Sequence, residues 1–532
     1  MPILLYAKPP LIIPTSASRY CFAGARLKWV ADIPEVCDLP NRLERCFDKV
    51  RDAWWKIGKE MAKMPNGNLA HMPTCSTYAS DFGQVAAWSL LTRELAKESK
   101  TTIVICSDPW LFRDIKDACT VCTHAPPILF PTLGLLFRGF LARVYLVAKV
   151  AWKHLLAIRT RKYHKNVSKV IMVYAHPESC ANGLDAYFGD LMLKNSHLFR
   201  LIHTDGDIRH SLSLAADKRT ASLHAWGRLS WLPRLLFARW KLSKPNKKDL
   251  FAWLIMRAVV LEASGASAAI NLWQMLCQSA WLDEVSPQTV IWPWENHPWE
   301  RDFVQKAKKH GTLSVGYQHS VVGRHMYNQS PKSNIDGLSG LPDQLLANGP
   351  LYRDDLNAWG VPETRLSIAG AYRQRIRKKS NFDPSGPIFV GLSNNPLFST
   401  QMLDAIKICA TKGLGPFLLK EHPMYPYSIK NSEGVKITDK HFTEHARISA
   451  LIYCTGTIGL EGILNSIPTF RFQPSGYVAL DILPKGMGVI NVNTSNLLIA
   501  LKSSPKQPSH DPRSIFAPIQ NQIWKKFLTH KK

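Results

Sequence analysis

Two polar turns in the carboxyl-terminal third of the sequence carry residue types suited to binding a phosphate. Thr455-Gly456-Thr457 follows the apolar run LIYC and opens a helical pattern. Lys420-Glu421-His422-Pro423 follows the apolar run PFLL, and Pro423 stiffens the turn that presents His422. Backbone N–H groups at a helix start attract an anion, and lysine and histidine neutralise or protonate a phosphate leaving group. The two turns predict a nucleotide-phosphate site formed by Lys420, His422, Pro423, Thr455, Gly456 and Thr457.

Three further residues extend this predicted donor site. Glu461 follows Thr457 by about one helical turn, within reach of a sugar hydroxyl beside the phosphate. The run PIFVGLSN (387–394) is typical of a strand that ends in a Gly/Ser/Asn turn, and this turn contributes Gly391 and Ser393. Taken singly, these features also fit ordinary roles: an N-cap, a polar loop and a solvated glutamate.

Two polar turns in the middle of the sequence supply a second set of groups. Glu295 follows the strand pattern TVIWPW, and Gln318 and His319 follow the strand pattern TLSVGY. A carboxylate in such a loop is placed to act as general base for an acceptor hydroxyl, and the other two side chains to hydrogen-bond a substrate or exchange protons with it. We predict Glu295, His319 and His422 as catalytic residues and Gln318 as an acceptor ligand.

The neighbours of Glu295 leave alternatives open. Trp294 and Trp299 are predicted acceptor ligands that stack on a sugar face, or they simply pack in the core. Glu300 lies in the first turn of the next helix, after Pro298 at its first position. It either stabilises the helix start or takes part in catalysis.

Motifs for other chemistries are missing from the sequence. There is no GxxxxGK[ST] motif, and the first βα turn lacks the GxGxxG fingerprint. The histidine spacings do not match a helical zinc site, and Cys119-x-x-Cys122 has no second pair. The sequence therefore predicts neither a metal ion nor a cofactor.

The elements that position these turns alternate between strands and helices, which is typical of parallel, doubly wound sheets. Ligands bind such sheets at the carboxyl ends of the strands, so the turns after residues 391, 420 and 453 should share one edge. Single helices are expected over Asp249–Trp281 and Phe442–Ser449, and the final helix, Ile515–Leu528, is expected to cross back to the first half. The predicted fold is α/β and GT-B-like, with two Rossmann-like domains facing a cleft. Its expected parts are an acceptor-side domain (1–372), a basic linker (373–386), a nucleotide-sugar domain (387–505), and a C-terminal helix and tail (506–532).

Composition and net charge limit the classes of binding partner. The 532 residues are 46% hydrophobic and 20% charged, as in globular multidomain proteins, and the formal net charge is +27. Such a charge suits nucleic acid, an anionic membrane or acidic small substrates, and the lack of nucleic-acid-binding motifs argues against the first. The 11 scattered cysteines fit a reducing compartment, and the proline-interrupted N-terminus is unlike a signal peptide. We expect a cytoplasmic protein bound peripherally to the inner face of the inner membrane.

One segment carries the membrane prediction. Nine Lys or Arg residues and no acidic residue lie between Asp117 and Glu178, and residues 123–160 include a strongly apolar helical pattern. The uninterrupted apolar part falls short of the roughly 18 residues that a membrane span needs. On a helix, Arg138, Lys149 and Lys153 fall within about 60° of each other, as in a helix lying on an anionic membrane surface. The alternative is a buried helix pair with snorkelling basic side chains.

The motifs resemble a known family. KEHP (420–423) and TGTIGLEGILNSIPTF (455–470) resemble the carboxyl-terminal half of bacterial GT-B glycosyltransferases of surface polysaccharide synthesis, chiefly capsule-type enzymes that use CMP-activated Kdo or sialic acid. ENHPWE and GYQHS resemble surface carbohydrate biosynthesis proteins. The resemblance covers about residues 170–500. It implies that His422-Pro423 matches an HP motif, and Thr455 and Thr457 a Ser/Thr motif, that bind the CMP phosphate. The acidic motif that supplies the base in related sialyltransferases has no copy here, and Glu295 is the substitute.

These observations predict a metal-independent glycosyltransferase of capsule, O-antigen or lipopolysaccharide synthesis. Its expected donor is a nucleotide sugar, with a CMP-sugar favoured, and its acceptor is a glycan or lipid-linked glycan. The alternatives are a polyol-phosphate transferase or nucleotide-sugar epimerase on a related fold, and a non-catalytic membrane-associated glycan assembly factor.

Overall fold

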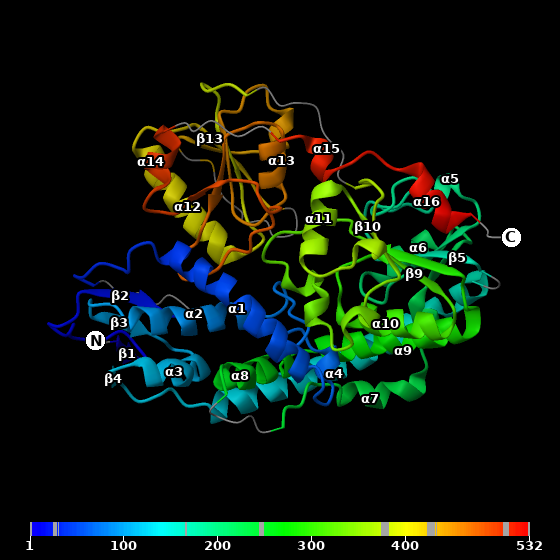
Figure 1. Ribbon diagram of the computed structural model, residues 1–532, viewed down its shortest axis with the longest axis horizontal. Coiled ribbons are helices and arrows are strands. Elements are labelled where there is room, and N and C mark those ends of the chain that lie inside the picture. The colour runs from blue at the N-terminus through cyan, green and yellow to red at the C-terminus, as the bar shows by residue number, and fades with distance from the viewer. Residues whose placement is uncertain are drawn as a thin grey trace.

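The computed structural model contains three parallel β-sheets surrounded by helices (Figure 1). It describes residues 3–24, 29, 31–164, 167–243, 249–373, 382–422, 431, 433–503 and 510–529. The longer helices are α1 (Leu39–Met61), α2 (Phe82–Leu95), α4 (Leu129–Ala157), α8 (Ala252–Ala263), α9 (Ser267–Val285), α10 (Pro298–Lys309), α11 (Pro350–Ala358), α12 (Pro396–Thr411) and α16 (Asn521–Leu528). The shorter ones are α3 (Pro109–Ile115), α5 (Leu191–Lys194), α6 (Ile208–Leu214), α7 (Leu232–Leu236), α13 (Ile458–Leu464), α14 (Leu497–Lys502) and α15 (Pro512–Ile515).

The middle of the chain forms a seven-stranded sheet in the order β11-β10-β9-β8-β5-β6-β7. Every neighbouring pair is parallel. The central strands are apolar runs buried on both faces, as parallel sheets covered by helices require. The strands are β5 (Lys169–Val173), β6 (Leu198–Ile202), β7 (Thr220–Ser222), β8 (Thr289–Pro293), β9 (Leu313–Tyr317), β10 (Gln344–Ala347) and β11 (Leu366–Ile368).

The carboxyl-terminal third forms a six-stranded parallel sheet in the order β14-β13-β12-β15-β16-β17. Its strands are β12 (Ile388–Gly391), β13 (Phe417–Lys420), β14 (Val435–Ile437), β15 (Ala450–Tyr453), β16 (Thr469–Phe472) and β17 (Ile490–Val492). Numbered within each sheet, both orders are 3-2-1-4-5-6, and the larger sheet adds a seventh strand. This is the doubly wound Rossmann order. The α/β prediction with two Rossmann-like units is therefore confirmed, and so is the prediction that Thr455-Gly456-Thr457 follows an apolar strand and opens a helix.

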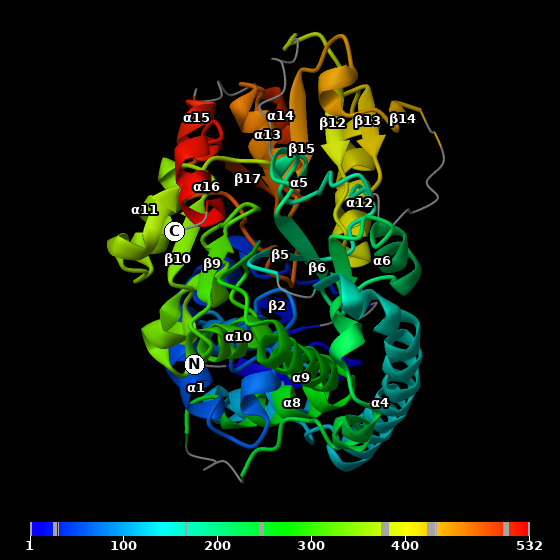
Figure 2. The same cartoon turned by 90° about the vertical axis from the view of Figure 1, so that its right-hand side faces the viewer.

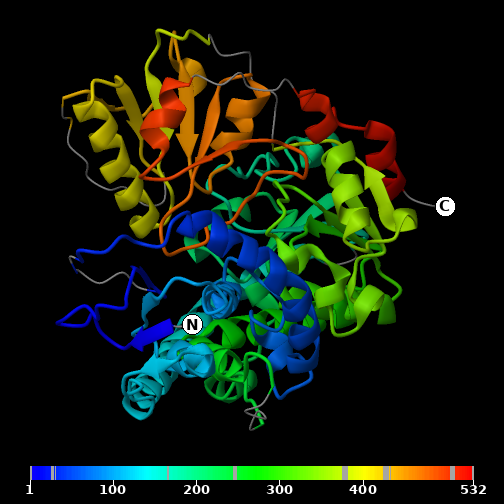
Figure 3. The same ribbon diagram turned by 60° about the vertical axis from the view of Figure 1, so that its left-hand side comes forward.

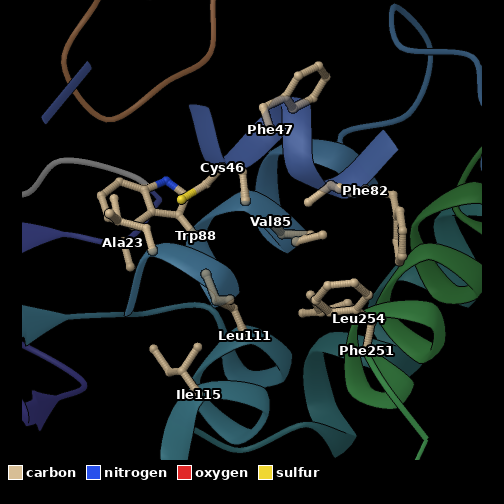
Figure 4. Close-up of a cluster of buried hydrophobic side chains, with 14 of the residues drawn as sticks. Ala23, Cys46, Phe47, Phe82, Val85, Trp88, Leu111, Ile115, Phe251 and Leu254 are labelled. Atoms are coloured by element: carbon tan, nitrogen blue, oxygen red, sulfur yellow. The ribbon is translucent and has the colours of Figure 1, made fainter. Parts of the chain in front are cut away.

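The first part of the chain forms a third sheet, which the sequence did not separate from the seven-stranded one. Its order is β2-β3-β1-β4, with β1 (Ile3–Tyr6), β2 (Arg19–Phe22), β3 (Thr102–Ile105) and β4 (Val121–Cys122). Figure 4 shows its core, where Phe82 and Val85 of α2 lie near Leu254 of α8 and Trp88 of α2 lies beside Ala23. Because α8 comes from the middle of the chain, this core unites two distant segments.

Three predicted helices differ in the structure. The final helix expected over Ile515–Leu528 is the pair α15 and α16, and residues 516–520 lie between them. The single helix expected over Asp249–Trp281 is the pair α8 and α9, bent by 66° at the break. Ser264 ends α8 and is followed by Gly265, which favours a break. The helix expected over Phe442–Ser449 is only a 3-10 turn, Phe442–Glu444.

The end of the chain returns to the seven-stranded sheet, as predicted. Trp524 of α16 donates a hydrogen bond from Nε1 to the Ala369 carbonyl at 3.0 Å and packs against Tyr317. Figure 1 shows α15 and α16 beside α11 and β10. Of the predicted linker, residues 374–381 lie outside the described residues, and the domain boundaries stay a prediction.

The third sheet is also joined to the six-stranded one. Glu44 of α1 accepts hydrogen bonds from Arg471 Nη1 at 2.9 Å and from Gln473 Nε2 at 2.7 Å, and all three side chains are buried. Trp88 Nε1 donates to the Gly476 carbonyl at 3.1 Å. Figure 3 shows α1 passing beneath the carboxyl-terminal sheet. These contacts close one side of the space between the two Rossmann-like sheets.

Candidate functional site

A cavity of about 350 Å³ lies between all three parts of the molecule. It brings together three of the four predicted clusters, from segments up to about 160 residues apart. Its lining residues are Ser76, Tyr78, Trp294, Glu295, His297, Gln318, His319, Ser320, Val321, Met326, Asn328, Gln329, Thr455, Thr457 and Ile482.

The strand order explains this convergence. In the seven-stranded sheet the order reverses between β5 and β8, and Glu295 follows β8 directly. In the six-stranded sheet it reverses between β12 and β15, and Thr455 follows β15. The crevice at such a switch point is where doubly wound sheets bind ligands. The cavity thus joins the switch points of both sheets.

Glu295 stands between two histidines. Its Oε2 lies 2.6 Å from His297 Nε2, and its Oε1 lies 3.6 Å from His319 Nε2. The Glu295 side chain is 37% exposed and that of His319 only 6%. Tyr187 packs edge-on against the His319 ring at 5.1 Å, and Arg373 lies over the Tyr187 ring at 5.6 Å. The carboxylate therefore has one tight partner and one looser partner.

The environment separates the pKa values of these groups. Burial alone would raise the pKa of Glu295, but the hydrogen bond and charge of His297, with His319 and Arg373, lower it to about 2. Burial would lower the pKa of His297, and the Glu295 carboxylate raises it above its usual value. Burial lowers the pKa of His319 to about 4, against the pull of Glu295. At neutral pH the site therefore holds an ionised Glu295 beside a neutral His319.

Glu300 holds the loop that carries Glu295. Its buried carboxylate accepts hydrogen bonds from Trp292 Nε1 at 2.8 Å and from the backbone N–H groups of Glu295 and His297 at 3.2 and 3.0 Å. Asn296 makes the sharp turn at φ 59°, which asparagine tolerates better than most residues. Of the two alternatives for Glu300, the structure favours the one at the helix start.

Arg301 is a positioning residue that sequence reasoning missed. Its buried guanidinium donates from Nε to the Asn296 carbonyl, from Nη1 to the Ser333 carbonyl and from Nη2 to the Thr74 carbonyl, each at 3.1 Å. Thr74 lies 227 positions away in the chain. Arg301 thereby ties together three loops around the cavity.

Tyr78 is the second residue that sequence reasoning missed. It lies on the loop before α2 and is 58% exposed, unusually open for an aromatic ring beside an interior cavity. It lines the first cavity and also a neighbouring cavity of about 460 Å³. The neighbouring cavity is also lined by Asp81 and Gln84 from one side and by Asn394, Asn395 and Thr455 from the other. No local sequence motif around Tyr78 pointed to this position.

The predicted donor residues meet at the switch point of the six-stranded sheet. The Ser393 and Thr455 hydroxyls lie 3.1 Å apart, and Ser393 Oγ also accepts from the Asn395 N–H. The Thr457 hydroxyl lines the cavity and makes no capping bond to α13. A Cβ on Gly391 would lie 2.9 Å from Ile458 Cγ2, so this glycine permits close packing of the turn that contains Gly456.

The other predicted donor residues lie further from the cavity. Lys420 Nζ donates to the Asp439 carbonyl, and Glu461 pairs with His441 Nε2 at 3.2 Å. Strand β12 lies between β13 and β15, so the Lys420 turn follows the second strand away from Thr455. His422 is half-buried, which lowers its pKa, and Pro423 lies outside the described residues.

The predicted acceptor residues are mostly enclosed. Trp294 and Trp299 are 1% and 4% exposed, and Trp299 packs against His203 with ring centroids 4.7 Å apart. Gln318 accepts from the Asn348 N–H at 2.9 Å and donates to the Ser320 carbonyl. Packing accounts for Trp299, whereas Trp294 and Gln318 also line the cavity, so their role as acceptor ligands stays a prediction.

Within the part of the chain that the structure describes, no group of three or more His, Cys, Asp or Glu side chains is arranged to hold a metal ion.

No protein-family model and no curated protein matches the sequence. Solved structures similar to this chain include a glycotransferase of kitacinnamycin, with 13% identity, 65% of this chain and 92% of that chain covered, and a TM-score of 0.37. The UDP-GlcNAc 2-epimerase from Neisseria meningitidis bound to UDP-GlcNAc is 10% identical, with 68% of this chain and 99% of that chain covered and a TM-score of 0.38. The UDP-GlcNAc 2-epimerase from Methanocaldococcus jannaschii in complex with UDP-GlcNAc and UDP is 12% identical, with 65% of this chain and 96% of that chain covered and a TM-score of 0.36. Likeness at this level carries no argument about function, and the fold assignment rests on the strand orders.

Proposed function

We propose that the protein is a GT-B-type glycosyltransferase that moves a sugar from a nucleotide sugar to a glycan hydroxyl. One observation carries the proposal. Glu295, at the switch point of one Rossmann-like sheet, and His319, after the neighbouring strand β9, line the same cavity as Thr455 and Thr457 from the switch point of the other. A nucleotide sugar and an acceptor held across such a cavity would meet where one sheet supplies proton-transfer groups and the other supplies hydroxyls.

The proton transfer is assigned to Glu295 and His319 together. A carboxylate with a pKa of about 2 is by itself a weak base at neutral pH. The neutral His319 imidazole can take the proton of the acceptor hydroxyl, and the ionised Glu295 stabilises the imidazolium that forms. The proton would go to Nε2, the ring nitrogen that faces Glu295, because Nδ1 is buried. The 3.6 Å separation would shorten as that charge develops.

The donor phosphate is assigned to the other side of the cavity. The Thr455 and Thr457 hydroxyls and the backbone N–H groups of their turn are suited to phosphate oxygens. Lys420 and His422 would bind the donor only if the loop that carries them moved toward the cavity, since Lys420 Nζ bonds to Asp439. A CMP-activated sugar is the favoured donor because the HP and Ser/Thr motifs resemble those of CMP-sugar transferases, and surface polysaccharide is the proposed product.

A thermal-shift screen followed by an activity assay tests this proposal. Purified protein is mixed with CMP, CDP and UDP and with CMP-Kdo, CMP-sialic acid, CDP-glycerol and UDP-GlcNAc. A ligand that binds only the folded state raises the melting temperature, and we expect CMP compounds to give the largest rise. Slow release of CMP from the stabilising donor would support glycosyl transfer. Conversion of UDP-GlcNAc to its 2-epimer, or glycerol-phosphate transfer from CDP-glycerol, would replace the proposal by one of the alternatives. No stabilisation by any nucleotide would contradict it.

A further inference from the structure

Among the residues that the structure describes, none covers one apolar face of helix α4. Phe130, Phe137 and Trp152 are 77, 65 and 61% exposed. Exposed apolar side chains recur at helical spacing along most of its length, so they form one continuous stripe. Figure 2 shows α4, in cyan, at the outer margin of the molecule. The stripe consists of Leu129, Phe130, Leu133, Phe137, Phe140, Leu141, Val144, Tyr145, Trp152 and Leu155.

The opposite face of α4 is buried and mixes apolar side chains, Leu146 and Val150, with basic ones. Arg143 donates from Nε to the Leu236 carbonyl at 2.9 Å and from Nη1 to the Ala263 carbonyl at 3.0 Å. Lys153 Nζ donates to the Gly206 carbonyl at 2.7 Å. Both side chains are under 10% exposed. This corrects the prediction for Lys153, which faces the protein and not the same surface as Arg138 and Lys149.

Exposed cations border the apolar stripe. Arg138 and Lys149 are exposed, and on an ideal helix both lie within about 120° of the stripe's centre on one flank. Lys149 Nζ lies 6.0 Å from the Tyr145 ring centroid, which brings a cation to the edge of the stripe. No acidic residue occurs between Asp117 and Glu178. The surface is therefore complementary to one that is both apolar and anionic.

The length and charges of α4 fit a helix lying in a membrane surface. Among the described residues, no single helix has the length and apolar content of a membrane span; the bent pair α8 and α9 passes on those two criteria. That pair contributes Leu254, Ile255, Trp273 and Trp281 to the buried cores. A 29-residue helix is about 44 Å long, enough for a stripe that lies parallel to a bilayer.

We propose that the apolar stripe of α4 docks this protein onto a lipid bilayer with anionic headgroups. Phe, Leu and Trp side chains enter the interface, where aromatic residues are favoured. Arg138 and Lys149 bind the headgroups. Docking is independent of the sugar donor and of the catalytic assignment.

Helix α4 is connected through packed side chains to the sheet edge at which Glu295 lies. His154 Nδ1 lies 2.9 Å from the His224 carbonyl, and Lys153 bonds to the loop that follows β6. His203 of the same loop packs against Trp299, in the first turn of α10, four residues after Glu295. The membrane therefore lies on the side of the molecule that is joined through this loop to the catalytic edge.

Vesicle sedimentation tests the proposal on the full chain. Vesicles of phosphatidylglycerol and phosphatidylethanolamine should carry the wild-type protein down, and pure phosphatidylcholine vesicles should bind it far less. The triple variant F130E/F137E/W152E should bind the anionic vesicles at least about 100-fold more weakly, because three apolar anchors become anions that the headgroups repel. The double variant R138Q/K149Q, which keeps the apolar stripe and removes its two flanking cations, should weaken binding about tenfold and reduce its salt dependence.

A matched control separates this stripe from surface apolarity in general. Ile408, Ile490 and Ile499 are exposed on the six-stranded sheet and its helices, and I408E/I490E/I499E should bind vesicles like the wild type. Circular dichroism and melting temperature confirm that each variant is folded. Wild-type protein that ignores anionic vesicles, or a folded F130E/F137E/W152E variant that binds them unchanged, would overturn the proposal. A third outcome would also overturn it: the wild type binds no vesicles but forms a stable dimer, seen by light scattering, and the F130E/F137E/W152E variant is a monomer.

Discussion

The two Rossmann-like sheets share a strand order but differ at the edges that face the cavity. The seven-stranded sheet presents ionisable groups, Glu295, His297 and His319, with one carboxylate between two imidazoles. The six-stranded sheet presents the Ser393, Thr455 and Thr457 hydroxyls on a small-residue turn. One edge can move protons and the other can bind an anion. Under the proposed function, the same topology serves two chemical tasks, and the turn residues decide which.

The two edges are also held differently. Buried charge fixes the edge of the seven-stranded sheet: Glu300 holds the Glu295 backbone and Arg301 bonds to three loops. The edge of the six-stranded sheet depends on close packing, as at Gly391 against Ile458. We therefore expect substitutions at the first edge to disturb proton transfer and substitutions at the second to disturb binding.

The largest expected effect is on catalysis at the first edge. Glu295→Gln removes the charge that stabilises a protonated His319 while keeping the shape, and should lower kcat by about 10²- to 10⁴-fold. Donor affinity should change little. Steady-state kinetics with the donor found by the screen measures both. The control is Glu363→Gln, an exposed position just before β11 of the same sheet. An unchanged kcat would remove Glu295 from the mechanism.

The next effect concerns the contact that closes the space between the sheets. Glu44→Gln removes the nearest carboxylate from the buried Arg471 guanidinium, which then keeps, among the described residues, only Asp481 at 3.8 Å, and should lower the free energy of unfolding by about 3 kcal/mol. Glu60→Gln, at an exposed position on the same helix, should have almost no effect. Urea denaturation of the two variants measures the difference. Equal stabilities would mean that the Glu44 contact does not hold the third sheet to the six-stranded one.

A smaller effect is expected on binding at the second edge. Thr455→Val and Thr457→Val each remove one hydrogen-bond donor to a charged phosphate and should weaken nucleotide binding by about 10- to 100-fold. Calorimetric titration with the nucleotide measures this loss, and exposed Thr411→Val serves as the isosteric control. If instead kcat fell while affinity held, the division of tasks between the two edges would be wrong.

The last effect is a dependence of stability on pH, which is negligible at neutral pH and grows on acidification. Burial lowers the pKa of His164 and His319 to about 4 and that of His224 to about 3, and also lowers the pKa of His203. The unfolded chain binds these protons near pH 6.5, so stability is full above that pH and falls as the pH drops toward 4. Each histidine costs up to about 1.4 kcal/mol per pH unit.

Hydrogen exchange at pH 7 and pH 5 can locate this loss. Because these histidines pack around the seven-stranded sheet, its amides should lose protection before those of the six-stranded sheet. Uniform loss of protection, or stability that rises on acidification, would contradict the assignment.

Local patterns in the sequence predicted much of the site. Glu295, His319 and Thr455 each follow an apolar strand directly, and strand ends of parallel sheets converge. Tyr78 and Arg301 could not be found this way, because the Arg301–Thr74 contact joins residues 227 positions apart. The helical wheel of α4 identified its apolar stripe, but not which face the protein would cover. Lys153 was assigned to the wrong side because its partner, the Gly206 carbonyl, belongs to a distant loop.

The central claim is that both edges act on one nucleotide sugar, and donor turnover tests it most directly. Release of CMP from CMP-Kdo or CMP-sialic acid is followed for the wild type, Glu295→Gln and the Thr455→Val/Thr457→Val double variant. The account predicts measurable release by the wild type, loss of kcat in the first variant, and a raised KM in the second. Turnover unaffected by either change, or no turnover of any nucleotide sugar by folded wild-type protein that binds it, would contradict the account.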